Sequence, residues 1–295
     1  MTSWSLPDEL EATAPLTGPF PLSGFVAAWW GAFGVGDPVM ERSEEAAFAL
    51  VVDRGTARLP GDADLTDYHS PLGQHPESVI AATVSMLDPG TRLVLDSLPR
   101  EALEAVTAGL EVAGLTVSSR EHAVAMVLDL PADPDLYLAR LDAKQRHEVR
   151  RKRRRFVDAA GEPRLVRDAS LIDRFVSMHR AAEGDKGGFM TPSMEGFFGS
   201  LLNEAGAVLD VLVDGEGRPV AAAFGFEDDR AYYLYNSAFD PEHGGISPGV
   251  VLVHALVERT IASGRTRFDF LKGSESYKGR LGAEPRPLFV VEAAV

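Results

Sequence analysis

The sequence predicts an α/β (α+β) protein made of two domains, each with a mixed central sheet flanked by helices. The chain has 295 residues, which is more than one typical domain of about 100 to 150 residues needs. Strand-like and helix-like patterns alternate along it, and the two prolines at Pro131 and Pro134 interrupt any element that would cross that segment. We therefore expect a first domain over 1–132 and a second over 133–295.

The composition narrows the class of protein. Hydrophobic residues make up 45% of the chain and charged residues 25%, close to the average of folded globular proteins. No cysteine is present, which excludes disulfides, thiolate metal sites and a cysteine nucleophile. The N-terminal segment contains Asp8, Glu9 and Glu11 without a basic region before an apolar run, so we expect no signal peptide and a cytoplasmic protein. The histidines form no ligand motif, and no apolar run approaches the roughly 18 residues of a membrane span, so we expect neither a metal nor a membrane partner.

The first half is expected to contain a helix at 22–33, with Ser23 as a possible N-cap and with Trp29 and Trp30 in the core. Further along, the hydrophobic periodicity predicts strands at 47–52 and 65–68, a helix near 77–87, a strand at 92–96, a helix from Pro99 to 113, and apolar runs at 115–117 and 124–130.

A long basic helix is predicted over 142–160, ended by Gly161, because glycine often follows the last residue of a helix. Between Arg140 and Arg155 there are nine Lys/Arg against two acidic residues, so this segment has a charge of +7 in a chain of net charge −15. The imbalance favours a local anion site, and Arg150, Arg151 and Arg154 are candidate ligands for the phosphates of an acyl donor. The alternative is a solvated helix face.

The second half continues with a strand at 164–167 and two helices at 171–183 and 194–205. Three strands at 208–213, 220–226 and 231–238 follow with short turns, which predicts an antiparallel meander. A helix at 249–263 and two strands at 267–270 and 288–292 complete the expected elements.

Three segments of this half contain distinctive motifs. They are the basic helix with Arg146 and the run Ala159-Ala160-Gly161, the segment YYLYNSAFDPEHGGISPGVVL at 232–252, and the segment FDFLKGSESYKGRLG at 268–282. Together they resemble the branch of the GNAT superfamily that contains the Fem-type peptidyltransferases and the CelD-like acyltransferases. The resemblance implies tandem GNAT-like domains and an enzyme that transfers an acyl group to an amine.

The second segment suggests how a donor is held. Ser247, Pro248 and Gly249 begin a helix, and we expect the Ser247 hydroxyl to cap it and its free N–H groups to suit a pyrophosphate. Tyr235 and Asn236 lie near the end of the preceding strand, where the resemblance implies a border with the acyl donor; ordinary cross-strand packing is the alternative for Tyr235. The usual pyrophosphate loop of the superfamily is absent.

The third segment concentrates the polar residues. Asp269 lies between two phenylalanines in a strand, so it points to the opposite face, and Lys272 follows as a candidate donor contact. The resemblance implies that Lys278 approaches the reacting acyl group, where it would stabilise the oxyanion; a solvated loop lysine is the alternative. Asp269, Glu275 and Tyr277 are candidates for proton transfer. No Ser/His/Asp pattern stands out, which favours direct transfer without an acyl-enzyme.

These observations lead to one preferred function and two alternatives. The preferred function is transfer of a short acyl group from an acyl-CoA, such as acetyl-CoA, to the amine of a small molecule. The first alternative is a Fem-like enzyme that takes aminoacyl-tRNA as donor, with the basic helix against the acceptor stem; the absence of a helical arm argues against it. The second is a non-catalytic GNAT-fold binding module, against which the polar cluster at 269–278 argues.

Overall fold

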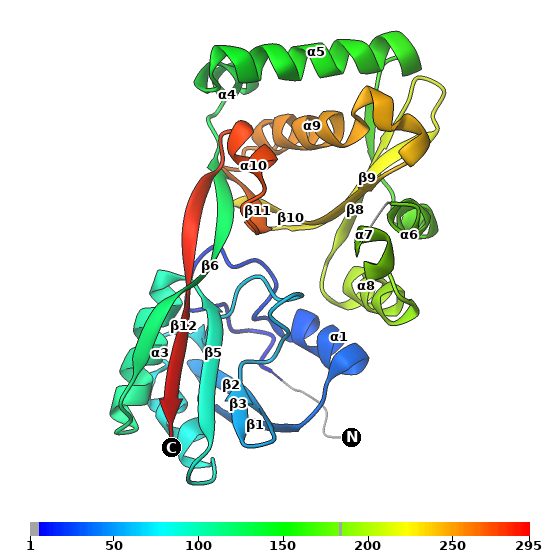
Figure 1. The fold of residues 1–295 in the computed structure, drawn as a ribbon. Helices are drawn as coiled ribbons and strands as arrows, with labels where there is room; N and C mark the ends of the chain where they lie inside the picture. Colours follow the sequence, from blue (N-terminus) through cyan, green and yellow to red (C-terminus); the bar gives the residue numbers. More distant parts are fainter. Residues whose placement is uncertain (1–5, 183–184) are drawn as a thin grey trace. The chain divides into compact units, whose positions relative to one another are not determined.

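The computed structural model describes residues 6–182 and 185–295. Contacts divide the chain into two compact units, the first made of Met1–Ala125 and Arg286–Val295, the second of Met126–Pro285. Figure 1 labels the helices and strands.

The first unit begins with α1 (Ser23–Phe33) and a group of short strands. Its elements in chain order are β1 (Asp37–Arg42), β2 (Ala46–Asp53), β3 (Thr56–Arg58), β4 (Leu72–Gly73), α2 (Glu77–Ser85), β5 (Arg92–Leu98), α3 (Arg100–Val112) and β6 (Ser118–Asp129). The sheet follows the order β1-β2-β3-β5-β12, in which β12 (Glu284–Ala294) comes from the end of the chain. β3 pairs with β5 in parallel, and β12 pairs with β5 antiparallel.

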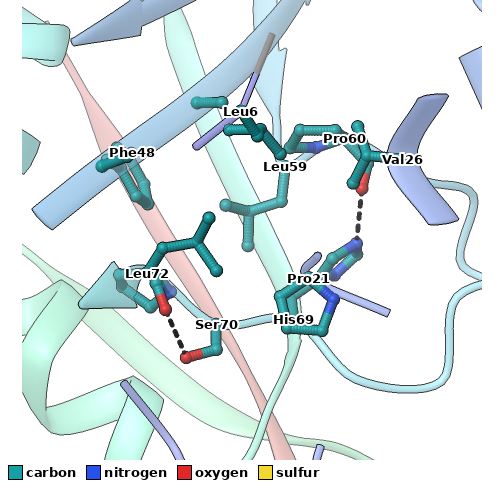
Figure 2. A pocket seen from close by; sticks show the side chains of 12 residues that line it. Leu6, Pro21, Val26, Phe48, Leu59, Pro60, His69, Ser70 and Leu72 are labelled. Carbon is teal, nitrogen blue, oxygen red and sulfur yellow. Dashed lines mark hydrogen bonds between the residues drawn. The ribbon is translucent and has the colours of Figure 1, made fainter. Parts of the chain in front are cut away.

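Apolar side chains from β2, β5, α2 and α3 form the core of this unit. Alternate residues of β5, such as Leu93 and Leu95, point into it and are fully buried, as the period of two in a strand requires. Figure 2 shows a small pocket of about 20 Å³ elsewhere in the unit, where His69 Nε2 lies 3.2 Å from the Pro60 carbonyl oxygen. That volume suits roughly one water molecule and is too small for an acyl-CoA.

Three expectations for the first half need correction. Ser23 does not cap α1, because it is the first helical residue and its hydroxyl donates to the Asp8 carboxylate. The strand expected at 65–68 is absent, since the N–H groups of Leu65 and Thr66 both donate to the Asp62 carbonyl in a turn. The run at 115–117 is not a strand; β6 starts at Ser118 and is one strand through Asp129.

The second unit contains most of the remaining chain. Its helices are α4 (Pro134–Arg140), α5 (Ala143–Ala160), α6 (Ile172–Arg180), α7 (Asp185–Phe189), α8 (Pro192–Glu204), α9 (Pro248–Ala262) and α10 (Ser276–Arg280). Its strands are β7 (Arg164–Arg167), β8 (Val208–Val213), β9 (Pro219–Glu227), β10 (Ala231–Phe239) and β11 (Arg267–Lys272), in the order β11-β10-β9-β8-β7. The helix expected at 171–183 ends earlier, at Arg180, and residue 183 lies outside the described residues.

The sheet of the second unit lies between two layers of helices. α9 packs on one face and α5 covers α9, whereas α6, α7 and α8 lie on the other side (Figure 1). Aromatic rings fill the second interface: Phe198 of α8 contacts Phe224 of β9 and Tyr235 of β10, with ring centroids 4.6 and 5.7 Å apart. Both faces of the central strands are therefore covered.

The predicted ends of the basic helix are confirmed. Asp142 caps α5 in a capping box with Gln145, and Gly161 follows its last turn with a φ of 76°, which favours glycine. The Gly215 N–H donates to the Ala160 carbonyl at 2.8 Å and fixes the end of the helix to the β8–β9 turn.

A buried ionic cluster joins α9 to three strands. Asp210 of β8 is fully buried and accepts hydrogen bonds from Arg259 of α9, Arg167 of β7 and the hydroxyl of Tyr232 of β10. Burial raises the pKa of the Asp210 carboxyl, but the hydrogen bonds from Arg259 and Arg167 outweigh it and hold the pKa below its usual range. The cluster orients α9 on the sheet.

The units differ from the domain ranges 1–132 and 133–295 in two segments. Residues 126–132 lie in the second unit, and 286–295 lie in the first. The chain therefore contributes the last strand of its first unit after completing the second. The assignment of domains to 1–132 and 133–295 stays a prediction.

Candidate functional site

The neighbouring strands β10 and β11 pair over a short length only. Their parallel pairing covers three residue pairs and ends at Tyr233 opposite Asp269. Among the described residues, the later parts of the two strands do not pair with each other, although β10 continues to Phe239 and β11 to Lys272. The strands therefore separate where the sequence placed Tyr235, Asn236 and Asp269.

A β-bulge in β10 lies at this point. Leu234 is opposite Gly225 and Asn236 is opposite Phe224, so Tyr235 is an extra residue between them. The bulge brings two successive side chains to the side of α6 and α8, because Tyr235 contacts Phe198 and Asn236 contacts His179. The ring contacts of Tyr235 are accounted for by packing, which was the alternative to a border with the acyl donor.

His179 of α6 is a buried polar residue that the sequence motifs did not indicate. It is 1% exposed, and its Nε2 lies 3.1 Å from Asn236 Oδ1. Because an amide oxygen accepts only, Nε2 donates this hydrogen bond. The rings of Phe175 and Phe189 lie 5.9 and 5.4 Å from the imidazole. The pair fixes the orientation of the Asn236 amide and leaves its NH₂ group directed away from the imidazole.

Asp269 lies at the centre of β11 and is fully buried. Its Oδ1 accepts the N–H of Leu271 at 2.8 Å, and Leu271 has a φ of 60°, which is rare for a branched side chain. Asp269 thus holds the backbone turn with which β11 ends. Strand alternation puts it on the face of Tyr233, opposite Phe268 and Phe270, as predicted.

Lys278 is not a solvated loop lysine, because it is only 3% exposed. Its Nζ donates to the carbonyl oxygens of Lys272 at 2.7 Å and Gly273 at 3.1 Å, with Leu271 at 3.4 Å. Glu275 Oε2 lies 2.9 Å from the same nitrogen. The ammonium therefore has a full set of acceptors, and it binds the end of β11 to α10.

Glu275 immediately precedes α10, and Tyr277 lies in its first turn. Glu275 is more than half exposed, so its carboxylate is open to solvent. Burial, with a smaller contribution from the charge of Glu275, raises the pKa of Tyr277 to about 12. Tyr277 is therefore a protonated hydroxyl at neutral pH, and its ring packs on Phe270 at 6.1 Å. Lys272 is the last residue of β11.

The start of α9 differs from the expected cap. Ser247 precedes the helix with a φ of 59°, and its side chain makes no capping hydrogen bond. Its carbonyl accepts the N–H groups of Val250 and Val251 at 3.1 and 3.3 Å, and Pro248 has no N–H. Within the described part of the chain, Gly249 is the residue of this first turn whose N–H has no acceptor. The prediction of a hydroxyl cap with several free N–H groups was wrong.

The basic residues of α5 lie apart from the strand ends. Val149 and Phe156 are the buried residues of α5, which packs on α9. Arg150, Arg151 and Arg154 are exposed on the opposite side, as the helical repeat of 3.6 residues requires. The fold thus groups Tyr235, Asn236 and Asp269, and separately the residues of α10, but it does not direct these arginines toward α9.

Comparison with known proteins identifies this part of the fold. Residues 143–279, from the first residue of α5 into α10, match the model of the acetyltransferase (GNAT) domain family. Residues 143–279 are thus similar in sequence to the GNAT domain, and this similarity supports an acyltransferase.

Solved structures with a similar fold cover both units. FemX has a TM-score of 0.65 at 11% identity, over 96% of this chain and 93% of that chain. L-PGS from Bacillus licheniformis has a TM-score of 0.60 at 13% identity, over 93% and 92%. A conserved protein of unknown function from Bacteroides thetaiotaomicron VPI-5482 has a TM-score of 0.60 at 10% identity, over 92% and 90%. The predicted fold class and the likeness to Fem-type proteins are confirmed.

One further comparison found no match, and the described residues offer neither a membrane-spanning helix nor a metal-binding cluster. No curated protein matches the sequence. Across residues 6–182 and 185–295, none of the helices combines the length and the apolar character that crossing a membrane requires. In the same residues no group of three or more His, Asp or Glu side chains is arranged to hold a metal ion.

Proposed function

We propose that the protein transfers an acyl group from an acyl-CoA, such as acetyl-CoA, directly to the amine of a small molecule at the separated ends of β10 and β11. The observation that supports this most is the end of β10–β11 pairing at Tyr233 and Asp269, beside the β10 bulge and within the GNAT domain. Unpaired strand ends can bind an extended acyl chain through backbone hydrogen bonds.

In this proposal the amine nitrogen attacks the thioester carbonyl, and the tetrahedral oxyanion collapses with cleavage of the C–S bond. The Asn236 NH₂, oriented by His179, is a candidate donor to the oxyanion. The exposed Glu275 is the candidate acceptor of the amine proton, and Tyr277, protonated at neutral pH, the candidate donor to the leaving thiolate.

The remaining candidates act on the site through the backbone. Lys278 holds three carbonyl groups of the β11 end, and Asp269 holds the Leu271 N–H, so both position that end. We propose that Gly249 contributes its N–H to the donor pyrophosphate and that Lys272 contributes a charge nearby.

A Fem-like transfer from aminoacyl-tRNA is the second candidate. Two observations favour it: the likeness to FemX extends over nearly the whole chain, and the start of α9 offers one free N–H, that of Gly249, among the described residues. A pyrophosphate normally receives several such donors.

The test measures thiol release from acyl-CoAs in the presence of a panel of amines, with intact masses of the products. The chain has no cysteine, so the protein contributes no thiol background. A parallel reaction contains charged tRNA, with and without ribonuclease. We expect amine-dependent thiol release that falls at least tenfold in Asn236→Ala and stays unchanged in Asn203→Ala, an exposed asparagine of α8.

Other outcomes decide between the alternatives. Transfer from charged tRNA that is lost with ribonuclease, together with no thiol release from any acyl-CoA, would show that the donor is aminoacyl-tRNA. Binding of either donor without transfer would make the domain a binding module.

A further inference from the structure

The outward side of α5 carries a continuous row of exposed basic side chains. These residues, which we name the α5 basic face, are Lys144, His147, Arg150, Arg151, Arg154 and Arg155. They follow one another at helical spacings of three and four residues, on the side of the helix opposite Val149 and Phe156. Over the 18 residues of α5 the helix extends about 27 Å.

Most of this face lacks anionic partners, although the exposed Asp158 lies beside Arg151, Arg154 and Arg155. Arg151 pairs with Glu148 at 2.8 Å. Arg150, Arg154 and Arg155 form no hydrogen bond or ion pair with any residue in 6–182 or 185–295, although the chain has 44 acidic residues against 29 Lys and Arg. Like charges at this spacing repel one another and destabilise the helix. An anion from outside the protein would relieve that repulsion.

The shape of the face favours a flat anionic partner. The cations lie on a single outer helix, whereas the rest of the chain has a net charge of −22, the difference between −15 and +7. A polyanion that bends around the protein would meet that negative charge, whereas a flat surface need meet only the outer side of α5. The face includes no Phe, Tyr or Trp side chain on which unpaired nucleic-acid bases could stack.

The helix α4, which immediately precedes α5, has an exposed apolar side chain. Arg146 donates to the carbonyl oxygens of Leu141 at 2.7 Å and Ala139 at 3.0 Å, so it fixes α4 to the start of α5. On α4, Leu136 is 56% exposed. An exposed leucine can enter the boundary between lipid headgroups and acyl chains.

We propose that the α5 basic face docks the protein on an anionic phospholipid surface, with the guanidinium groups of Arg150, Arg154 and Arg155 on lipid phosphates. Arginine binds phosphate oxygens with paired N–H donors, which suits this contact. The proposal departs from the expectation of no membrane partner in respect of peripheral contact. The proposal does not depend on the identity of the acyl donor.

The test is co-sedimentation of the full chain with vesicles of phosphatidylcholine alone or mixed with phosphatidylglycerol. We expect binding that needs phosphatidylglycerol and weakens with salt. Each basic residue near such a surface contributes about 1 kcal/mol. The triple variant Arg150→Glu, Arg154→Glu and Arg155→Glu should therefore lower the affinity by at least roughly 100-fold.

The matched control reverses three exposed arginines of the first unit, Arg54→Glu, Arg58→Glu and Arg120→Glu, and so changes the net charge equally. It should keep most of the binding. Equal loss in both variants, or no binding to either vesicle, would overturn the proposal. Duplex RNA that binds to wild type but not to the α5 variant, without vesicle binding, would assign the face to nucleic acid instead.

An assay of acyl transfer between soluble substrates distinguishes membrane docking from the proposed enzymatic function. We expect the α5 triple variant to keep the wild-type KM for acyl-CoA. A KM raised at least tenfold would assign the arginines to the donor and contradict docking.

Discussion

Replacing Asp210 with Asn tests the ionic cluster that joins α9 to the sheet. Asp210 is fully buried and accepts from Arg259 Nη1 and Nη2 at 2.6 and 2.5 Å and from Arg167 Nε at 3.0 Å. It also accepts the Tyr232 hydroxyl at 3.0 Å. The amide keeps the size of the side chain, removes its charge and turns an NH₂ group toward these donors.

The expected loss of stability in Asp210→Asn follows from the burial of the ion pairs. Removing one partner of a buried ion pair costs about 3 to 5 kcal/mol. The side chains of Arg167 and Arg259 are 38% and 32% exposed, so water can solvate part of their charge and the lower end, about 3 kcal/mol, applies. At roughly 2 to 4 °C per kcal/mol for a unit of this size, Tm should fall by about 6 to 12 °C.

Calorimetry measures the change in Tm, and hydrogen exchange assigns it to the second unit. The control is Glu292→Gln, which breaks the Arg92–Glu292 pair, whose side chains are 62% and 35% exposed; it should cost at most about 1 kcal/mol. A Tm of Asp210→Asn within about 2 °C of wild type would refute the structural role of the cluster.

The Asp210 carboxylate should also make the stability of the folded protein depend on pH. The pKa of Asp210 is lower in the folded state than in the unfolded chain, so the stabilisation is complete above the unfolded value, about 4. It is lost as the pH falls through the lower, folded pKa. Asp210→Asn should therefore lack part of the stability loss that wild type shows below about pH 4.

Three further predictions concern single residues of the second unit. Tyr232→Phe removes one buried hydrogen bond and should cost about 1 kcal/mol, but in urea titrations it should cost less in the Asp210→Asn background, because both act on one cluster; full additivity would contradict the coupling. Lys278→Met should lower Tm by roughly 4 to 8 °C, because three carbonyl groups lose their donor; a wild-type Tm with turnover reduced at least 100-fold would instead support direct action on the oxyanion. Gly199→Ala in α8, with open space around the new methyl, should stabilise by about 0.5 to 1 kcal/mol, whereas Gly225→Ala should destabilise because its Cβ would lie 2.6 Å from the Tyr233 carbonyl oxygen; thermal melts giving the same sign for both would count against this local geometry.

Most elements could be predicted because their signals are local. The end of α5 follows from Gly161, and the meander from three apolar runs with turn residues between them. β1, which begins with Asp37 and Pro38, was missed because its residues are exposed or half-buried and show no alternation. The beginning of β6 was missed for the same reason, since its first five residues are exposed. Pairing of β12 with β5 has no local signal at all.

The candidate site was predicted in part. The motifs indicated Asn236 and Asp269, which lie where the strands separate. They could not indicate His179, because a lone histidine in a helix has no spacing that reveals a partner on a distant strand. They also could not show that the Lys278 ammonium is surrounded by carbonyl groups, since backbone acceptors have no sequence signature.

Because β12 returns to the first unit, the sheet of that unit lacks a strand until the second unit has been synthesised. Arg92 of β5 and Glu292 of β12 hydrogen-bond although 200 residues separate them in the chain. While the ribosome makes the second unit, the edge of β5 that β12 later covers has yet to receive this partner and remains open to other strands. The first unit to be translated is thus completed only after the second unit has been made.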